Sequence, residues 1–303
     1  RTDRRAGLRL YDAGGLAMNI QWYPGHMTKT RRMIAEQLKN VDAVCEILDA
    51  RIPISSRNPD VDELTAGKPR LVVLNRVDQA DPASTRRWAD FFRARGYAVL
   101  ETNAKGGAGT TRFAAAVREL LADKLRSYAE KGMAGRVVRV MILGIPNVGK
   151  STFINQVAGR KTAKTEDRPG VTRSKQWVPI DKGLELLDTP GILWPKFEDQ
   201  QVGLRLALIG SIRDEILNQD EMAIELIEYL KNHYQGILAD RYQVDENEDK
   251  VKILEQIALN RNCKMKGNEL DYEKASKIVL EEFRNGKLGK ISLETPEEGT
   301  KEA

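Results

Sequence analysis

Short apolar runs alternate with longer amphipathic segments from residue 43 to about residue 190. Short apolar runs bounded by turn residues are typical of buried strands, and apolar residues every three or four positions are typical of helices that cover a sheet. The alternation predicts an α/β fold with a mainly parallel sheet. We expect strands at 43–49, 70–74, 97–101, 137–143, 176–180 and 184–187, and helices at 29–39, 82–95, 110–130 and 150–158.

The pattern changes near residue 200, where apolar residues recur only at helical spacing. Amphipathic segments at 202–212, 221–234, 248–260 and 272–285 predict a small all-helical domain. We therefore expect an α/β domain over residues 18–200, a helical domain over 201–290 and a frayed tail over 291–303. Residues 1–17 carry arginines but no apolar stretch, and we interpret them as a disordered extension or a non-native remnant ahead of Met18 rather than a secretory signal.

Length and composition agree with two globular domains. The chain has 303 residues, and a domain typically has roughly 150. Hydrophobic residues make up 41% of the chain and charged residues 31%, which is typical of a globular protein. The longest uncharged apolar run, 140–146, is far shorter than the roughly 20 residues that cross a bilayer, so we expect no membrane span. Two cysteines and two histidines cannot form a Cys/His zinc site or a disulfide framework, and we expect a cytoplasmic protein.

Charge is distributed unevenly along the chain. Residues 1–204 carry 34 Lys and Arg against 23 Asp and Glu, a net charge of +11, whereas residues 205–303 carry 15 against 21, a net charge of −6. Six of the basic residues lie between Arg160 and Lys175, in a segment without helical periodicity. A basic loop favours a polyanionic partner such as nucleic acid, although lysine and arginine scattered over a solvated surface would give the same composition.

A phosphate-binding loop is the strongest motif. Residues 144–151, GIPNVGKS, match G-x-x-x-x-G-K-[ST] between a predicted strand and a predicted helix. In this arrangement backbone N–H groups wrap a phosphate chain at a helix N-terminus, Lys150 neutralises its terminal oxygens, and the Ser151 hydroxyl ligates Mg²⁺. Ordinary turn glycines would not explain the Lys and Ser that follow them.

A second phosphate-site element follows the predicted strand 184–187. Asp188-Thr-Pro-Gly191 places a carboxylate where it can hold the Mg²⁺ shell and a glycine N–H where it can meet the γ-phosphate. Thr172, in the basic segment between the two motifs, is the candidate for a second hydroxyl ligand of Mg²⁺. This combination predicts a loop that responds to nucleotide hydrolysis.

Two further motifs predict recognition of guanine. Asn75-Arg-Val-Asp78 follows a buried strand, and a carboxylate at Asp78 can accept from guanine N1–H and the 2-amino group, which adenine cannot offer. We expect Asn75 to tie this loop to the phosphate loop. In Thr102-Asn-Ala-Lys105, we expect the Ala104 N–H to bond guanine O6 and the Lys105 stem to cover the ring.

These motifs together are those of a GTPase in an unusual order, because the base-reading pair precedes the phosphate loop. The chain resembles the circularly permuted GTPases. Over residues 18–293 it is similar to the RbgA/YlqF family of ribosome-biogenesis GTPases, and this resemblance is carried by residues 20–27, by residues 49–55 and by the helical part. The resemblance implies a P-loop GTPase fold, GTP and GDP as ligands with Mg²⁺, and rRNA in the large ribosomal subunit precursor as partner. It further implies a role in a late step of subunit assembly, and we expect a monomer.

The chain departs from the common motifs at Arg76, where GTPases usually have Lys, and at Asn103, where they usually have Ser. An arginine can still lie over a purine, and Asn103 leaves the Ala104 N–H in place, so we expect guanine specificity to survive.

Hydrolysis by the chain alone should be slow, because Ile192 stands where many GTPases place the glutamine that orients water. The resemblance implies that His26 contributes to catalysis and that the large subunit stimulates turnover. Asn147 resembles an asparagine of cation-stimulated GTPases that coordinates K⁺, although it could instead be an ordinary loop residue that holds a turn.

The sequence thus predicts three sets of site residues. The catalytic set is His26, Lys150, Thr172 and Gly191; the Mg²⁺ set is Ser151, Thr172 and Asp188, with Asn147 for K⁺; and the nucleotide set is Asn75, Arg76, Asp78, Asn103, Ala104, Lys105, Asn147, Val148, Gly149, Lys150, Ser151, Thr152 and Gly191. RNA phosphates would meet Arg261, Lys264, Lys266 and the basic residues of 283–290. The alternatives are a permuted GTPase acting on another RNA or ribonucleoprotein, a P-loop ATPase or nucleotide kinase, and a binding module with a vestigial nucleotide site.

Overall fold

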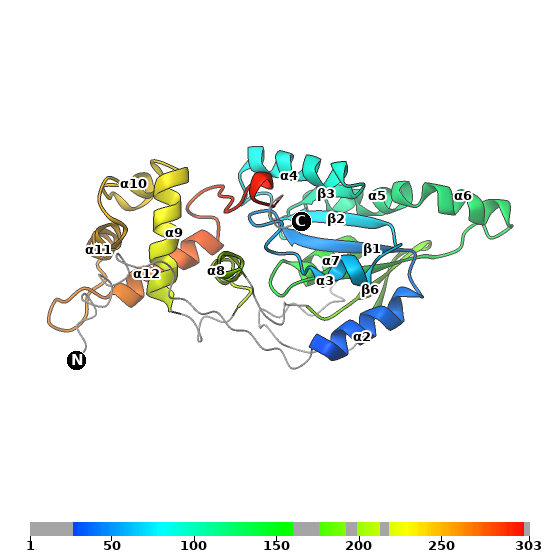
Figure 1. Ribbon diagram of the computed structural model, residues 1–303, viewed down its shortest axis with the longest axis horizontal. Coiled ribbons are helices and arrows are strands. Elements are labelled where there is room, and N and C mark those ends of the chain that lie inside the picture. The colour runs from blue at the N-terminus through cyan, green and yellow to red at the C-terminus, as the bar shows by residue number, and fades with distance from the viewer. Residues whose placement is uncertain (1–26, 160–175, 192–198, 213–217, 300–303) are drawn as a thin grey trace. The chain divides into compact units, whose positions relative to one another are not determined.

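The computed structural model describes residues 27–159, 176–191, 199–212 and 218–299 (Figure 1). These residues form two compact units: a sheet unit, comprising the described residues up to Gly191 together with 294–299, and a helical unit comprising those from 199 to 293. The predicted residues His26, Thr172 and Ile192, and the predicted extension 1–17, lie outside the described residues.

The sheet unit contains one six-stranded sheet of order β3-β2-β1-β4-β6-β5. β1 to β4 and β6 run parallel, and β5 is antiparallel to β6 at the edge. The predicted α/β fold with a mainly parallel sheet is confirmed. The strands are β1 (Ala43–Asp49), β2 (Arg70–Asn75), β3 (Ala98–Thr102), β4 (Val138–Gly144), β5 (Gln176–Asp181) and β6 (Leu184–Asp188).

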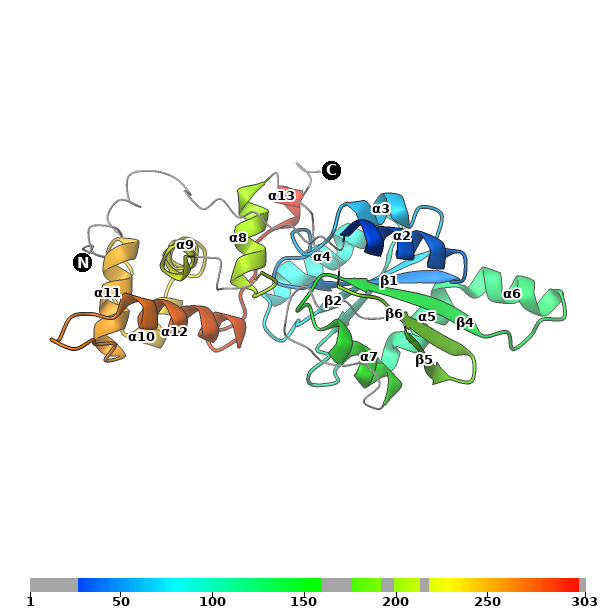
Figure 2. The same cartoon turned by 90° about the horizontal axis from the view of Figure 1, so that it is seen from below.

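Helices cover both faces of this sheet (Figure 2). Side chains at alternate positions share a face, so Val44 and Leu48 of β1 point to the same side. There they pack with α2 (Met27–Leu38), α3 (Asp60–Leu64) and α4 (Pro82–Ala94). On the other face, Phe113 of α5 (Phe113–Leu120) meets Phe153 of α7 (Lys150–Ala158) edge to face, with ring centroids 5.2 Å apart.

The predicted helix 110–130 is wrong as a single element. A short 3-10 turn (Thr110–Arg112) leads into α5, and the chain breaks at Leu121 before α6 (Ala122–Glu130). α6 has no buried residues, whereas α5 buries Phe113 and Val117. The apolar periodicity therefore describes only the part that packs on the sheet.

The parallel strands deliver their carboxyl ends to one edge of the sheet, where ligands bind in open α/β folds. The register pairs Asp49 of β1 with Asn75 of β2, and Asn75 with Thr102 of β3. It also pairs Ile142 of β4 with Asp188 of β6. All the predicted motifs that the structure describes therefore begin at this edge, although they are far apart in sequence.

The helical unit is organised around α9 (Gln219–His233), which contacts α8 (Gln200–Leu208), α10 (Ile237–Tyr242), α11 (Lys250–Asn260) and α12 (Tyr272–Arg284). Asn218, Asp249 and Asp271 cap three of these helices by accepting from backbone N–H groups in the first turn. Arg284 donates to the carbonyls of Ala207 and Leu208 at the end of α8. The sequence pattern missed the short α10.

The predicted frayed tail is wrong for residues 291–297. Ile291 and Leu293 are 1% and 2% exposed in the helical unit. Glu294 is 2% exposed in the sheet unit, and α13 (Pro296–Gly299) lies beside α4 (Figure 1). The polar composition suggested a solvated end, but two apolar side chains and one hydrogen-bonded carboxylate fix this segment.

In the described part of the chain, no helix has the length and apolar character needed to cross a membrane.

Candidate nucleotide-binding site

The phosphate loop runs from β4 into α7 as predicted. Lys150 is the first residue of α7, and Gly149 precedes it with φ +93°. A Cβ at Gly149 would lie 2.4 Å from Asn75 Nδ2, so this position requires glycine for both its backbone angle and its close approach. Ser151 and Thr152 are half-buried in the first turn, where the N–H groups of a helix start can meet an anion.

Asn75 joins three loops, which confirms the contact with the phosphate loop that the sequence predicts. Its Nδ2 donates to the carbonyl of Val148 at 2.8 Å. Its Oδ1 accepts from the Ala104 N–H at 2.9 Å and from the Thr102 hydroxyl at 3.0 Å. Asn75 is 2% exposed, so all three hydrogen bonds are shielded from water. One amide side chain therefore fixes the base-reading motifs against the phosphate loop.

Arg76 reaches the same loop. Its Nη2 donates to the Asn147 carbonyl at 2.9 Å, and its Nε lies 3.7 Å from Oδ2 of Asp49. Both Arg76 and Asn147 have φ of +64°, a left-handed backbone that is uncommon outside glycine. The guanidinium thus connects the phosphate loop to the end of β1, and its predicted stacking on a purine stays a prediction.

A buried ion pair beneath Arg76 was not among the predicted site residues. Arg51 donates to the Asp49 carboxylate through Nε at 2.9 Å and Nη2 at 2.7 Å, and the two side chains are 1% and 0% exposed. Burial by itself would raise the pKa of Asp49, but the charge and hydrogen bonds of Arg51, with a contribution from Arg76, hold that pKa below its usual value. The only sequence signal was an acidic strand end followed by a basic residue two positions later.

Lys150 and Asp188 meet directly. The Lys150 ammonium contacts the Asp188 carboxylate and the Thr189 carbonyl, and both side chains are almost fully buried. The Thr189 hydroxyl donates to the Ile142 carbonyl at 2.6 Å, which holds the start of the Asp188–Gly191 loop against β4. A Cβ at Gly191 would lie 3.1 Å from Pro146 of the phosphate loop, so these two loops are in close contact.

This geometry fits a Mg²⁺–triphosphate site. A carboxylate, a hydroxyl and a lysine converge on the start of α7, which is the donor set that hard cations and phosphates require. The Ser151 hydroxyl and Asp188 are the described residues that would hold the ion. Among the described residues there is no cluster of three or more His, Cys, Asp or Glu side chains able to bind a metal by itself.

The other base-site residues lie in the two neighbouring turns. Asp78 and Lys105 are exposed and therefore accessible to a ligand from solvent. The Asn103 carbonyl oxygen Oδ1 accepts from the Gly106 N–H at 3.0 Å and so shapes its own turn. The Ala104 N–H, predicted to meet guanine O6, donates to Asn75 in this structure.

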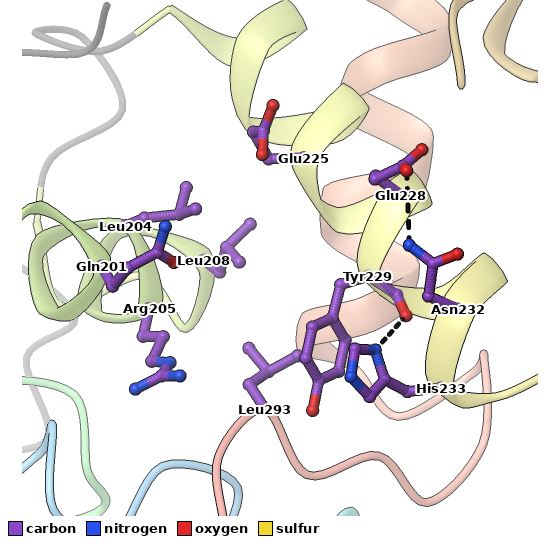
Figure 3. A pocket seen from close by; sticks show the side chains of 10 residues that line it. All are labelled: Gln201, Leu204, Arg205, Leu208, Glu225, Glu228, Tyr229, Asn232, His233 and Leu293. Atoms are coloured by element: carbon purple, nitrogen blue, oxygen red, sulfur yellow. Dashed lines mark hydrogen bonds between the residues drawn. The ribbon is translucent and has the colours of Figure 1, made fainter. Parts of the chain in front are cut away.

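A separate cavity of about 200 Å³ lies within the helical unit between α8 and α9 (Figure 3). It contains none of the predicted nucleotide residues. Tyr229 and His233 stack on one side with ring centroids 4.1 Å apart, and Leu293 lies next to them. Both polar and apolar side chains line this cavity, and none of them belongs to the phosphate site.

The fold and the site define a P-loop GTPase whose sequence motifs are circularly permuted. Residues 139–260 match the family model described as 50S ribosome-binding GTPase. Ribosome biogenesis GTPase A of Bacillus cereus is 51% identical over 282 residues, which cover 93% of this chain and 95% of that relative. The Thermotoga maritima protein of the same name is 32% identical over 281 residues, covering 93% and 96%.

A solved structure agrees with these relatives. The crystal structure of GNP-bound YlqF from T. maritima superposes with a TM-score of 0.64 at 29% identity, covering 89% of this chain and 99% of that one. The chain belongs to the ribosome biogenesis GTPase A family, also called RbgA/YlqF. It is a GTPase, and the predicted family, fold and hydrolytic activity are confirmed.

Proposed function

We propose that this GTPase is a nucleotide-controlled switch that binds rRNA in the large ribosomal subunit precursor and promotes a late step of its assembly in the cytoplasm. The observation that carries the proposal is Asn75, whose amide joins the base-reading loops to the phosphate loop. This link joins motifs that follow three strands into one site, and it favours a GTPase over a general P-loop ATPase. The names of the relatives, which include the phrase ribosome biogenesis, support the assembly role.

In this proposal each side chain binds a different part of the nucleotide. Asp78 reads the guanine edge, and Lys105 covers the ring. Lys150 leaves Asp188 for the β- and γ-phosphates when nucleotide enters, and Ser151 and Asp188 hold Mg²⁺. A bound Mg²⁺ would neutralise phosphate oxygens and so stabilise charge that develops during hydrolysis.

The proposal keeps hydrolysis slow in the isolated protein and faster on the ribosomal subunit. Ile192, beside Gly191, has no hydrogen-bonding side chain to orient water. His26 and Thr172 remain candidates for this task and for the second Mg²⁺ ligand. Asn147, whose carbonyl Arg76 holds, remains the candidate for a K⁺ ligand.

The helical unit supplies the proposed RNA contacts. Lys264, Lys266, Lys287 and Lys290 are exposed and available to phosphates. Arg261 is engaged within the unit, because it lies 3.6 Å from the Glu282 carboxylate and donates to the Arg241 carbonyl. We therefore assign RNA binding to the four lysines.

Steady-state GTP and ATP hydrolysis, with and without purified large ribosomal subunits and in K⁺ or Na⁺ buffer, tests the proposal. GTP turnover that rises with large subunits supports it, and turnover that ignores them removes the proposed partner. Preferential ATP turnover would refute the base site.

A single substitution tests Asp78 itself. Asp78→Asn should weaken GTP binding by roughly two orders of magnitude and favour xanthosine triphosphate, because it reverses one donor and acceptor pair. Asp90→Asn, on the exposed surface of α4, is the matched control and should change neither affinity. Unchanged GTP affinity of Asp78→Asn would exclude Asp78 from the base site.

A further inference from the structure

The Glu294 carboxylate is buried in the sheet unit and accepts hydrogen bonds from one loop. It accepts from the Ile54 N–H at 2.5 Å, from the Ser55 N–H at 3.1 Å and from the Ser55 hydroxyl at 2.6 Å. The Glu294 carbonyl accepts from the indole N–H of Trp88 at 3.3 Å. A carboxylate that receives several hydrogen bonds from buried donors holds their backbone in one conformation, because each donor would otherwise lose its partner.

The loop that Glu294 holds, residues 50–57, begins directly at the nucleotide site. The hydroxyl of Ser56 accepts from the Asp49 N–H at 3.0 Å, and the Ala50 N–H donates to the Asn75 carbonyl at 2.8 Å. Ile54 packs against the same apolar cluster as Val77, between Arg76 and Asp78. The loop therefore borders the base-reading turn along both its backbone and its side chains.

From Asp49 a series of polar contacts continues to the phosphate loop. Asp49 pairs with Arg51 and lies 3.7 Å from the Arg76 guanidinium, which donates to the Asn147 carbonyl. Each of these contacts involves a charged group, and Asp49 and Arg51 are shielded from water, where such interactions are strong, whereas the Arg76 side chain is 30% exposed. The Glu294 carboxylate is thus connected to Asn147 through contiguous polar contacts within the sheet unit.

Ser292, the residue before Leu293, is held by hydrogen bonds within the helical unit. The hydroxyls of Tyr229 and Tyr234 both donate to the Ser292 carbonyl, at 2.9 and 3.1 Å. Leu293 lines the cavity beside Tyr229 (Figure 3). One residue therefore separates a carbonyl fixed by the helical unit from a carboxylate fixed by the sheet unit.

We propose that Glu294 is a positioning residue for guanine-nucleotide binding, which holds loop 50–57 and, through Asp49 and Arg76, the phosphate loop in the binding conformation. The sheet unit then depends on a segment that follows the entire helical unit in sequence. This inference rests on the assignment of Asn75, Arg76 and the phosphate loop to the nucleotide pocket. Glu294 touches no nucleotide group itself.

The test compares Glu294→Gln with Glu297→Gln in the full chain. The glutamine keeps the shape of Glu294 but turns one acceptor into an amide donor that faces the donors of loop 50–57. Glu297 lies three residues away and pairs with Arg87 at an exposed site, so it is the matched control. We expect Glu294→Gln to weaken binding of fluorescent GDP about tenfold, or about 1.4 kcal/mol, and Glu297→Gln to leave it unchanged.

Steady-state kinetics separate positioning from simple loss of folded protein. A positioning role raises the KM for GTP while kcat at saturating GTP stays within about twofold, because saturating GTP selects the binding conformation of the phosphate loop. A merely structural role lowers the active fraction, so kcat falls and KM stays the same. The second pattern, or an unchanged GDP affinity, would overturn the proposal.

Two milder variants test the positioning role of Glu294 if Glu294→Gln does not fold. Ser55→Ala removes one of the donors and should weaken GDP binding about threefold, and Glu294→Asp, which keeps the charge, should retain more affinity than Glu294→Gln. Equal GDP affinity of wild type and Ser55→Ala would refute the role of the loop. Failure of the base site itself is distinguishable, because it appears as an unaltered nucleotide preference in Asp78→Asn.

Discussion

Replacing Asp49 by Asn should destabilise the sheet unit strongly. The substitution removes the negative charge that faces the Arg51 guanidinium in a site where the two side chains are 0% and 1% exposed. Removing one partner of a buried ion pair typically costs about 3–5 kcal/mol, since the remaining charge keeps its desolvation penalty without its compensation. For a unit of this size each kcal/mol shifts the melting temperature by about 2–4 °C, so we expect a decrease of about 10 °C.

Urea unfolding followed by tryptophan fluorescence measures this loss. Trp88 is fully buried among Leu48, Val72 and Phe92 and is therefore sensitive to unfolding of the sheet unit. The control is Asp90→Asn, in which the same chemical change removes an exposed partner of Arg93 and should cost less than about 0.5 kcal/mol. A difference below about 1 kcal/mol between the two variants would refute the argument that the buried pair stabilises this edge of the sheet.

The pH dependence gives the same prediction a second readout. The pKa of Asp49 is lowered in the folded protein relative to its usual value of 3.8. Its contribution to the free energy of unfolding is therefore present above pH 3.8 and is lost as the pH falls through the lower folded-state value. The difference in stability between wild type and Asp49→Asn should shrink only in this acidic range, and a difference that shrinks already near neutral pH would contradict the assignment.

Three further predictions follow from the site and from the helical unit. Gly149→Ala should abolish measurable GDP binding, because the added Cβ collides with Asn75. Gly96→Ala is the control and should leave GDP affinity intact, since Gly96 has a similar φ but no atom within 4 Å of an added Cβ. Equal GDP affinities of the two variants in a fluorescence titration would refute the close-approach argument. Glu282→Gln should destabilise the helical unit by about 1–3 kcal/mol in thermal unfolding. The hydrogen bond from Arg241 lowers the pKa of Glu282, so this stabilisation is present above pH 4.5 and is lost as the pH falls through the lower folded-state value. A variant as stable as wild type at pH 7 would contradict this prediction. Chelation of Mg²⁺ should weaken GTP binding about tenfold or more, and an affinity indifferent to chelator would argue against the cation site.

Local patterns were sufficient for the strands and for the phosphate loop. The predicted strand 43–49 coincides with β1, and the other predicted strands differ from the observed ones by about a residue at their ends. Strands that are buried on both faces appear as continuous apolar runs, which sequence reveals directly. The glycines, Lys150 and Ser151 form a contiguous motif, so their function also follows from local sequence.

Helix boundaries were less predictable where packing decides them. The single predicted helix 110–130 breaks at Leu121, because α5 packs against the sheet and α6 does not. The short α10 was missed, since six residues give too little periodicity to detect. Residues 291–297 appeared solvated in sequence, but the structure buries Ile291, Leu293 and Glu294.

The sequence by itself determined which chemical groups this protein has and the permuted order in which they occur: apolar runs that form parallel strands, a phosphate loop, a base-reading pair and a carboxylate at a strand end. Only the tertiary structure decided which of them touch, because contacts between distant residues depend on strand order and register. Asn75 meets Val148 across 73 positions because β1 lies between β2 and β4 and all three strands end at the same edge. Glu294 meets Ser55 across 239 positions, and no local pattern carries that information, since a single carboxylate becomes significant only where folding brings buried N–H donors to it.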